Sequence, residues 1–260
     1  MQAFTNYIKF VAILKNAKEM NIKKHVPNTI TLLNLFCGCI ALVFVSQQDF
    51  QMAFFFVFLG IFFDFFDGFF ARLFKVTGEL GLQLDSLADM VTSGVVPGYV
   101  MYYLLLNSQH EITSWSYFPF VGFVITMGSC YRLAFFNIDT RQSESFIGLP
   151  TPANSLFMLS LPLVIENSDS FFIFELLTNQ WVLVLITAFS AYILNAEIPL
   201  FSLKIKKFTL KDNLLQISFI TLALLLVLFF QYAGVPLVII SYVLLSVLNN
   251  KFSLDGKAKS

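Results

Sequence analysis

Long apolar runs separated by short polar breaks recur along this chain from Pro27 to Leu248. Hydrophobic residues make up 57% of the 260 residues and charged residues only 12%. A soluble domain carries about twice that charged fraction, so this chain has too few polar side chains to coat a water-facing globule. The sequence therefore predicts a polytopic membrane protein and excludes the soluble and disordered classes.

The apolar windows predict an all-α transmembrane bundle of about eight spans. The fifth and eighth windows are short for a bilayer that needs roughly 20 helical residues. The predicted spans cover residues 27–47, 51–74, 81–106, 116–137, 149–165, 179–202, 213–232 and 235–249.

The basic residues are distributed unevenly between the two sides of this predicted bundle. All 16 Lys and Arg residues fall in the N-terminal segment, in the second, fourth and sixth breaks, and in the C-terminal tail. The opposite breaks carry acidic residues such as Asp49 and Glu166 but no Lys or Arg. Because basic residues accumulate in cytoplasmic loops, both termini are expected in the cytoplasm. The predicted location is the cytoplasmic membrane.

The segment before the first span has its own pattern. Apolar residues recur at helical spacing with lysines on the flank, which favours an amphipathic helix lying on the cytoplasmic membrane surface. A solvated lead-in without membrane contact is a comparable alternative. The apolar positions are Phe4, Tyr7, Ile8, Val11 and Leu14.

Four aspartates interrupt the second and third apolar runs. Asp64 and Asp67 are three residues apart, and Asp85 and Asp89 are four apart, so each pair lies on one face of its helix. The two helices are joined by a short turn and must be antiparallel neighbours. Asp64 lies eight residues, or about 12 Å of helix, from Arg72 at the helix end. The four carboxylates can therefore converge inside the membrane, in a site open to the cytoplasm.

A carboxylate at mid-bilayer costs roughly 3 kcal/mol, so converging aspartates require cations or a polar cavity. Oxygen-only ligands favour Mg²⁺ or Mn²⁺, and four aspartates suit a pair of such ions. Two ions about 4 Å apart can stabilise both the attacking and the leaving oxygen in a displacement at phosphorus. Gly68 and Gly81 would let a phosphate-bearing ligand approach the backbone, and Arg72 could meet its phosphate. A proton relay and simple helix packing are the alternatives.

The run from Asp64 to Asp89 reads Asp-x2-Asp-Gly-x2-Ala-Arg-x8-Gly-x3-Asp-x3-Asp. This pattern resembles the signature of the CDP-alcohol phosphotransferase family in every residue and spacing. The resemblance implies that Asp64, Asp67, Asp85 and Asp89 ligate metal and that Asp89 is the general base. It also implies that the CDP site is lined by Gly68, Ala71, Arg72 and Gly81, with Asn28, Thr31 and Asn34 of the first span touching the nucleotide. Interhelical hydrogen bonding is an equal alternative for these last three residues.

The flanking segments are similar to those of the membrane-embedded bacterial and archaeal phosphatidylserine synthases of that family. These segments are Val26–Gly38, Ser93–Pro97, Arg132–Asn137 and Gly148–Ala153. The resemblance covers roughly residues 26–211, which we assign as the catalytic domain. Residues 1–25 form the interfacial segment, and residues 212–260 form two further helices and a basic tail.

This closer resemblance implies specific substrates. CDP-diacylglycerol and L-serine would react to give phosphatidylserine and CMP within a homodimer, with no nucleic acid as partner. We expect Arg132 or Arg141 to bind the serine carboxylate or a phosphate. Family members often carry a basic residue where Phe135 stands, so an anion contact at that position is absent from this chain.

Two other functions remain compatible with the sequence. The same metal chemistry could act on glycerol 3-phosphate or an inositol phosphate, although an additional phosphate should require a denser basic pocket. A cation-coupled transporter could use the four aspartates as an ion site. It would leave the Gly and Ala-Arg spacing of the motif unexplained.

Overall fold

The computed structural model describes residues 25–76, 78–109, 116–139, 146–201 and 213–258. The predicted amphipathic helix of the first 24 residues lies outside this part of the chain. Within the described ranges nearly all regular structure is helical, apart from an antiparallel strand pair in which Phe146 faces Leu200. The predicted all-α class is confirmed.

The helices follow one another with short connections. The first described helix is His25–Ser46. The elements after it are α2 (Phe50–Phe74), α3 (Glu79–Asp89), the π-helix η1 (Met90–Val95), α4 (Val96–Leu106), the 3₁₀-helix η2 (Phe118–Phe123), α5 (Val124–Phe136), β1 (Phe146–Ile147), α6 (Thr151–Asn167), α7 (Phe171–Thr178), α8 (Gln180–Asn195), β2 (Pro199–Leu200), α9 (Leu214–Phe230), the 3₁₀-helix η4 (Gln231–Ala233) and α10 (Gly234–Ala258).

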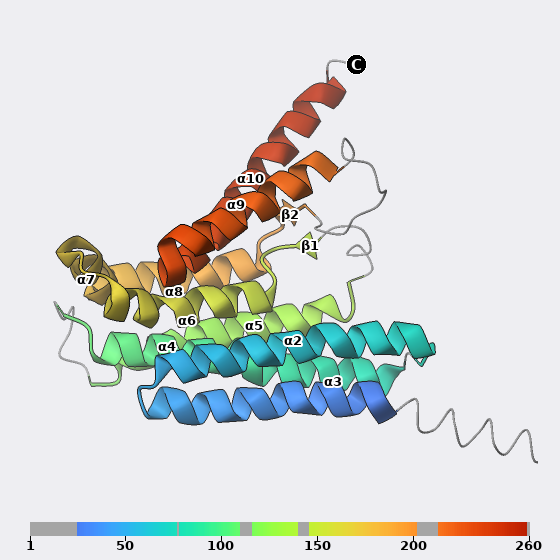
Figure 1. Ribbon diagram of the computed structural model, residues 1–260, viewed down its shortest axis with the longest axis horizontal. Helices are drawn as coiled ribbons and strands as arrows, with labels where there is room; N and C mark the ends of the chain where they lie inside the picture. Colours follow the sequence, from blue (N-terminus) through green and yellow to red (C-terminus); the bar gives the residue numbers. More distant parts are fainter. Residues whose placement is uncertain (1–24, 77, 110–115, 140–145, 202–212, 259–260) are drawn as a thin grey trace, which may run out of the picture.

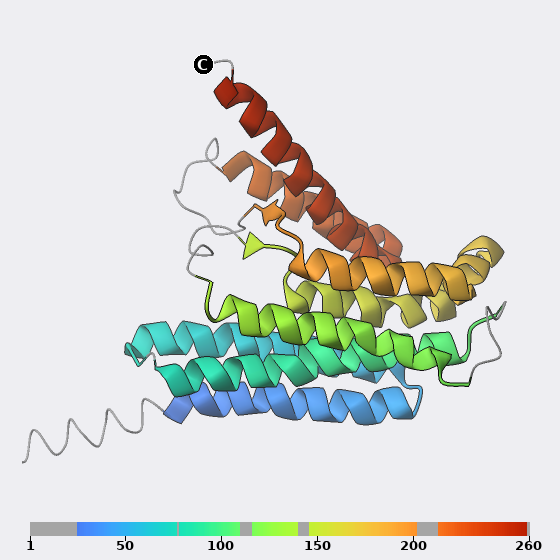
Figure 2. The same cartoon turned by 180° about the vertical axis from the view of Figure 1, so that it is seen from behind.

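The helices are arranged in layers (Figures 1 and 2). The first described helix, α2, α3–α4 and α5 lie side by side, and α6 and α8 cover one face of this group. The pair α9 and α10 crosses the outer side of α6 at a steep angle. This arrangement places the aspartate-bearing helices α2 and α3 on the side of the molecule away from α9 and α10.

Four helical stretches in the described part of the chain are long and apolar enough to cross a membrane. They are His25–Ser46, Phe50–Phe74, Phe118–Phe136 and Leu214–Asn250. The last stretch includes two of the predicted spans, because α9, η4 and α10 follow one another directly. The structure thus supports an integral membrane protein, and the count of eight spans stays a prediction.

The sixth predicted span ends earlier than the sequence indicated. We predicted a helix to residue 202, but α8 ends at Asn195 and the chain becomes extended before β2. The cause is Pro199, because a proline lacks an N–H donor and disfavours helical geometry in the residue before it. The short helix α7 was not predicted either.

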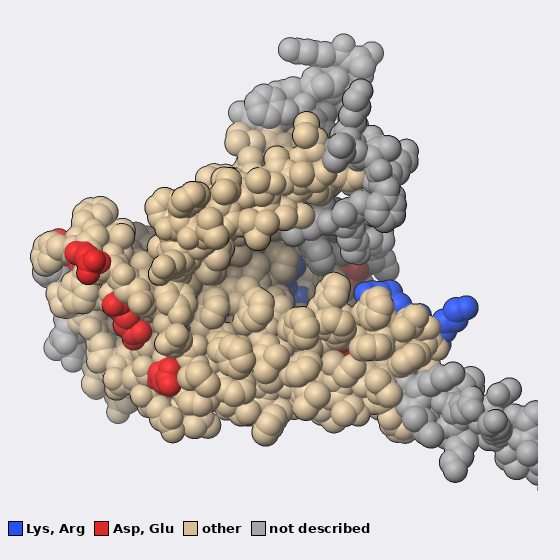
Figure 3. Space-filling model, in the orientation of Figure 1, with Lys and Arg blue, Asp and Glu red and all other residues tan. Residues whose placement is uncertain are grey.

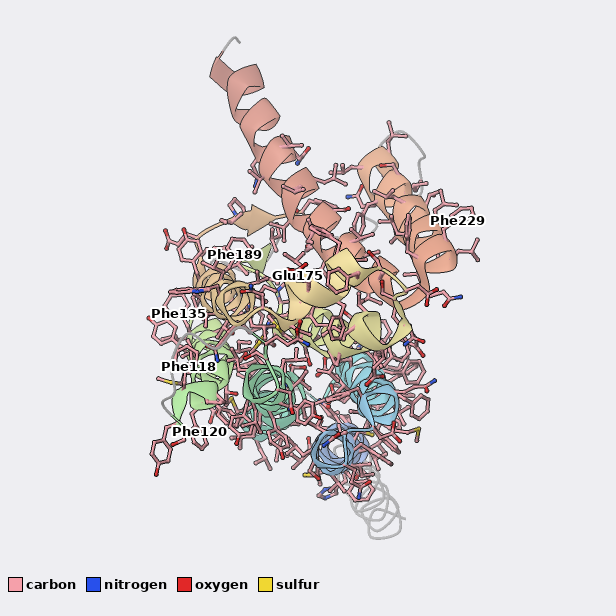
Figure 4. The ribbon with its side chains drawn as sticks, turned by 90° about the vertical axis from the view of Figure 1, so that its left-hand side faces the viewer. Phe118, Phe120, Phe135, Glu175, Phe189 and Phe229 are labelled. Atoms are coloured by element: carbon pink, nitrogen blue, oxygen red, sulfur yellow. The ribbon has the colours of Figure 1, made fainter. Side chains whose placement is uncertain are left out.

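The outward surface of the bundle is largely aromatic and aliphatic. On α2 the exposed side chains include Phe55, Phe58, Phe62, Phe65 and Phe69. Figure 4 shows Phe120 and Phe229 pointing outward from η2 and α9. In Figure 3, Asp and Glu appear at the end that holds α7, while Lys and Arg appear at the opposite end. An apolar surface between two charged ends fits a protein surrounded by lipid.

Close helix packing brings the first described helix, α2 and η1 together. A Cβ atom on Gly60 would lie only 2.8 Å from Asn34 Oδ1 and 2.8 Å from Thr92 Cγ2. Glycine therefore permits α2 to approach both neighbours closely. The Thr92 hydroxyl in turn donates to the Asn34 carbonyl oxygen at 3.1 Å. These contacts hold the polar side chains that surround the aspartates.

The C-terminal helix α10 is attached to the core through β2. The Tyr242 hydroxyl donates to the Phe201 carbonyl oxygen at 2.9 Å, and the Asn250 amide donates to the Pro199 carbonyl oxygen. Phe201, Phe219 and Tyr242 also pack against one another as aromatic rings. The extended segment after α8 thus gives α10 acceptors that a helical segment would have used internally.

Candidate metal and nucleotide site

Three of the four aspartates meet between α2 and α3. One carboxylate oxygen from each of Asp64, Asp67 and Asp85 lies within 4.8 Å of the other two. The helix α2 ends at Lys75, whose left-handed backbone (φ 55°) donates its N–H to the last-turn carbonyls of Ala71 and Arg72. This cap ends the helix sharply, so that α3 can return beside it. The predicted convergence is confirmed for these three residues.

Asp89 lies one helical turn beyond Asp85 and outside this group of three. Its side chain is buried, and its Oδ1 accepts a hydrogen bond from the Asn34 amide nitrogen at 3.1 Å. The π-helix η1 begins at the next residue, Met90. Such π-helical turns are frequent at functional sites, because they change the direction of the side chains around them.

Thr31 of the first described helix contacts the aspartate group directly. Its hydroxyl donates to Asp67 Oδ2, and both side chains are buried. A hydroxyl in this position orients the carboxylate and favours its ionised, metal-binding form. The resemblance had implied a nucleotide contact for Thr31, and the structure adds this contact with Asp67.

Thr31→Val is expected to weaken binding of a divalent ion by about 10- to 100-fold, the usual cost of removing a group that orients a metal ligand. Valine has nearly the same shape but cannot donate to Asp67. Binding of Mn²⁺ to the purified protein measures the effect. The matched control is Thr29→Val on the same helix, where the hydroxyl donates only to the His25 carbonyl oxygen. Equal Mn²⁺ affinity in the two variants would contradict the expectation.

A cavity of about 430 Å³ opens beside the aspartates. All six residues predicted for the CDP site line it together with Asp67 and Asp85. These six are Asn28, Thr31, Gly68, Ala71, Arg72 and Gly81. A Cβ atom on Gly68 would lie 3.6 Å from Arg72 Nη1, and one on Gly81 would lie 3.5 Å from Asn28 Oδ1. The two glycines therefore keep the space beside Arg72 and Asn28 open.

Sequence reasoning missed several other residues of this cavity. They are Pro27, Val76, Gly78, Glu79 and Leu82, most of which belong to the connection between α2 and α3. The family motif treats this connection as variable positions, so spacing alone carried no signal for them. Their location in the turn between two motif helices could have indicated that they lie at the cavity mouth.

A model of the CDP-alcohol phosphatidyltransferase family matches residues 24–248 of this chain. The chain belongs to this family. Its curated relatives include a CDP-diacylglycerol–serine O-phosphatidyltransferase of Bacillus subtilis, which is 34% identical over 141 residues, covering 53% of this chain and 75% of the relative. The Helicobacter pylori J99 protein of the same name is 31% identical over 147 residues, and the Saccharomyces cerevisiae protein is 30% identical over 177 residues. This chain covers 56% and 62% of its own length in these matches, and 60% and 59% of those two relatives.

The aspartates fit the metal dependence of this enzyme family. The group of Asp64, Asp67 and Asp85 presents only carboxylate oxygens, which suit Mg²⁺ and Mn²⁺ better than softer metals. Three carboxylates this close also repel one another strongly in a low-dielectric interior unless a cation lies among them. The chemistry and the spacing of these residues therefore agree with a divalent ion.

The two arginines predicted to bind the acceptor are not part of this cavity as the structure describes it. Arg132 is buried elsewhere, where its Nη1 donates to the carbonyl oxygens of Ile147 at 2.8 Å and Leu194 at 2.7 Å. It lines a separate crevice of about 150 Å³ together with Phe135 and Glu197. Arg141 lies outside the described residues. Arg132 thus ties α5 to β1 and to the end of α8.

Proposed function

We propose that this enzyme transfers the phosphatidyl group of CDP-diacylglycerol to the hydroxyl of L-serine, producing phosphatidylserine and CMP. The observation that supports this most directly is the shared cavity, where the residues predicted to bind CDP adjoin the aspartate group. The choice of serine is supported by the names of the bacterial and yeast relatives. It is also supported by the similarity of the flanking segments.

The orientation in the membrane is part of this proposal. Eight spans with both termini in the cytoplasm would place the mouth of the cavity on the cytoplasmic side. The acyl chains of the donor would then stay in the bilayer while its headgroup enters between α2 and α3. A water-soluble amino acid could reach the same place from the cytosol. The segregation of every Lys and Arg to one side supports this orientation.

Asp64, Asp67 and Asp85 would hold the divalent ion, and Asp89 could complete a two-ion cluster. When bound, such ions neutralise the pyrophosphate of the donor and the charge that develops on departing CMP. Arg72 would add a cation to the same cavity and contact a donor phosphate. Asn28, Gly68, Ala71 and Gly81 would line the nucleotide site.

Asp89 would act as the general base. The Asn34 amide holds Oδ1 of Asp89, so the other carboxylate oxygen can accept a proton. The serine hydroxyl oxygen forms a bond to the lipid-bearing phosphorus, the bond from that phosphorus to CMP breaks, and Asp89 receives the hydroxyl proton. Asn34 therefore positions the base, rather than touching the nucleotide as the resemblance had implied.

Release of CMP from CDP-diacylglycerol in mixed micelles tests the proposal. L-serine, glycerol 3-phosphate and inositol 1-phosphate are supplied in parallel, each with and without EDTA. We expect metal-dependent release with serine alone. Release only with a phosphorylated acceptor would refute the serine assignment and retain the metal chemistry. The absence of release with every acceptor, combined with ion-dependent flux, would favour the transporter.

The same assay tests the arginines and the assembly state. Arg132 or Arg141 would bind the serine carboxylate, so the corresponding Arg→Gln variant should raise the serine KM more than the KM for the donor. An unchanged serine KM in both variants would exclude this role. The resemblance also implies a homodimer, and the molecular mass of the detergent-solubilised protein tests that expectation.

A further inference from the structure

A second crevice lies on the opposite side of α6 from the aspartates. It has a volume of about 160 Å³ and is formed by side chains of α6, α8 and α10. Its walls are apolar, with Met158 from α6, Phe189 from α8 and Leu244 from α10 among them. Asn154 and Ser190 are its polar lining residues. The sequence analysis did not single out any of these residues.

Asn154 has a hydrogen-bond donor without an acceptor. Its side chain is 1% exposed, and its Oδ1 accepts from the Ser190 hydroxyl at 2.7 Å. Its amide nitrogen, Nδ2, finds no partner among the described residues. Because a buried amide donor is costly to leave unpaired, this group indicates a ligand that brings an acceptor into an otherwise apolar space.

The rim of the crevice belongs to the surface that faces lipid. Phe189, labelled on α8 in Figure 4, is 61% exposed, and Ile240 and Leu244 on α10 are 46% and 57% exposed. A ligand would therefore enter from the bilayer. The volume resembles that of apolar cavities of about 150 Å³ that accept a six-carbon ring, so it suits a segment of one acyl chain. The ester carbonyl at the head of such a chain supplies the missing acceptor.

The helix α6 separates this crevice from the catalytic cavity. Ser155, the next residue after Asn154, faces the other way, and its hydroxyl donates to the Thr92 carbonyl oxygen at 3.4 Å. Thr92 lies in η1, directly after Asp89. A chain held at Asn154 therefore lies on the far side of α6 from the aspartates, where it need not belong to the donor substrate.

We propose that the crevice binds one acyl chain of a bilayer glycerophospholipid, with the ester carbonyl accepting a hydrogen bond from Asn154 Nδ2. The lipid would fill the space between the core helices α6 and α8 and the C-terminal helix α10. It would thus brace α10, which the described structure otherwise attaches mainly through α6, β2 and its neighbours α9 and η4.

The test compares two lipids that differ only in the acceptor. Delipidated full-length protein is melted in detergent with dioleoyl phosphatidylglycerol or with its di-O-oleyl ether analogue, which lacks both ester carbonyls. The diester should raise Tm by about 2–4 °C more than the diether, the shift that one hydrogen bond gives a protein of this size. Equal shifts from the two lipids would overturn the proposal.

Two variants connect the effect to Asn154. In Asn154→Leu, which has a similar volume and no donor, the difference between diester and diether should disappear. In the matched control Ser190→Ala, the Asn154 donor remains and the difference should persist. If Asn154→Leu retains the difference, the proposal is wrong. Should that variant fail to fold, Ile240→Trp fills the crevice instead and should abolish the shift from both lipids, whereas an undiminished shift would refute the site.

A further measurement distinguishes a bilayer lipid from the donor. The KM for CDP-diacylglycerol in Asn154→Leu should equal that of the wild-type protein. A rise of about tenfold or more would mean that the crevice holds an acyl chain of the donor, and it would overturn the assignment to a bilayer lipid.

Discussion

Asp89→Asn is expected to lower kcat for CMP release by about 10³-fold, within the range that a general base contributes. Asparagine retains an oxygen that can accept from the Asn34 amide, so the local hydrogen bond and the fold should survive. It cannot take the proton of the acceptor hydroxyl. Steady-state kinetics measure the loss, and calorimetric titration with CDP should show that nucleotide binding is largely retained.

Asp49→Asn is the matched control for this experiment. Asp49 caps the N-terminus of α2 by accepting from the Met52 backbone N–H at 3.0 Å, and asparagine caps helices equally well. The control therefore removes a carboxylate without affecting either the fold or kcat. Full turnover in Asp89→Asn would remove Asp89 from the mechanism. The Mn²⁺ affinity of the same variant shows whether Asp89 also ligates an ion.

Asp64→Asn is expected to produce two opposite effects. It should abolish metal-dependent turnover, because it removes one of three carboxylates that lie within 4.8 Å of one another. In EDTA the same variant should be more stable than the wild-type protein, because the metal-free group loses a repelling charge. A gain of 1 kcal/mol corresponds to roughly 2–4 °C in Tm for a chain of this size.

Thermal melts with and without Mg²⁺ measure both effects. Saturating ion at about 100 times Kd should stabilise the wild-type protein by about 2.7 kcal/mol and the variant much less. Glu175→Gln is the control, since Glu175 is an exposed residue of α7. It should change neither turnover nor the response to Mg²⁺. A variant that is less stable than wild type in EDTA would contradict the repulsion on which the expectation depends.

The spacing of the aspartates was sufficient to predict their convergence. Residues three or four apart share a face of any regular helix, and a short turn forces two sequence-adjacent helices to lie side by side. Asp64, Asp67 and Asp85 meet for these local reasons. The glycines of the motif line the same cavity for the same reason, because the helical repeat places Gly68 and Gly81 near the turn.

The π-helix after Asp89 could not be predicted in this way. We expected one regular helix over residues 81–106, and a hydropathy pattern does not distinguish an i+5 register from an i+4 register. The buried polar residues of η1 contact other helices there, as when Thr92 donates to the Asn34 carbonyl and accepts from Ser155. Tertiary contacts of this kind decide how the chain turns around Asp89.

Arg132 illustrates the same limit for a charged side chain. The sequence placed it near the cytoplasmic end of its span, which made an anion contact reasonable. Its actual acceptors include the Leu194 carbonyl, which lies 62 residues further along the chain and becomes available because α8 ends at Asn195. No local pattern contains the position of a helix end so far away.

By itself, the sequence determined the membrane class, the helical character and the aspartate group, since hydropathy and helical periodicity act over a few neighbouring residues. The tertiary structure alone decided which residue orients each carboxylate, where Arg132 binds, and that an unpaired Asn154 amide lines an apolar crevice. Those properties depend on contacts between helices that are distant in sequence. Buried hydrogen-bonding groups take the partners that packing brings within reach.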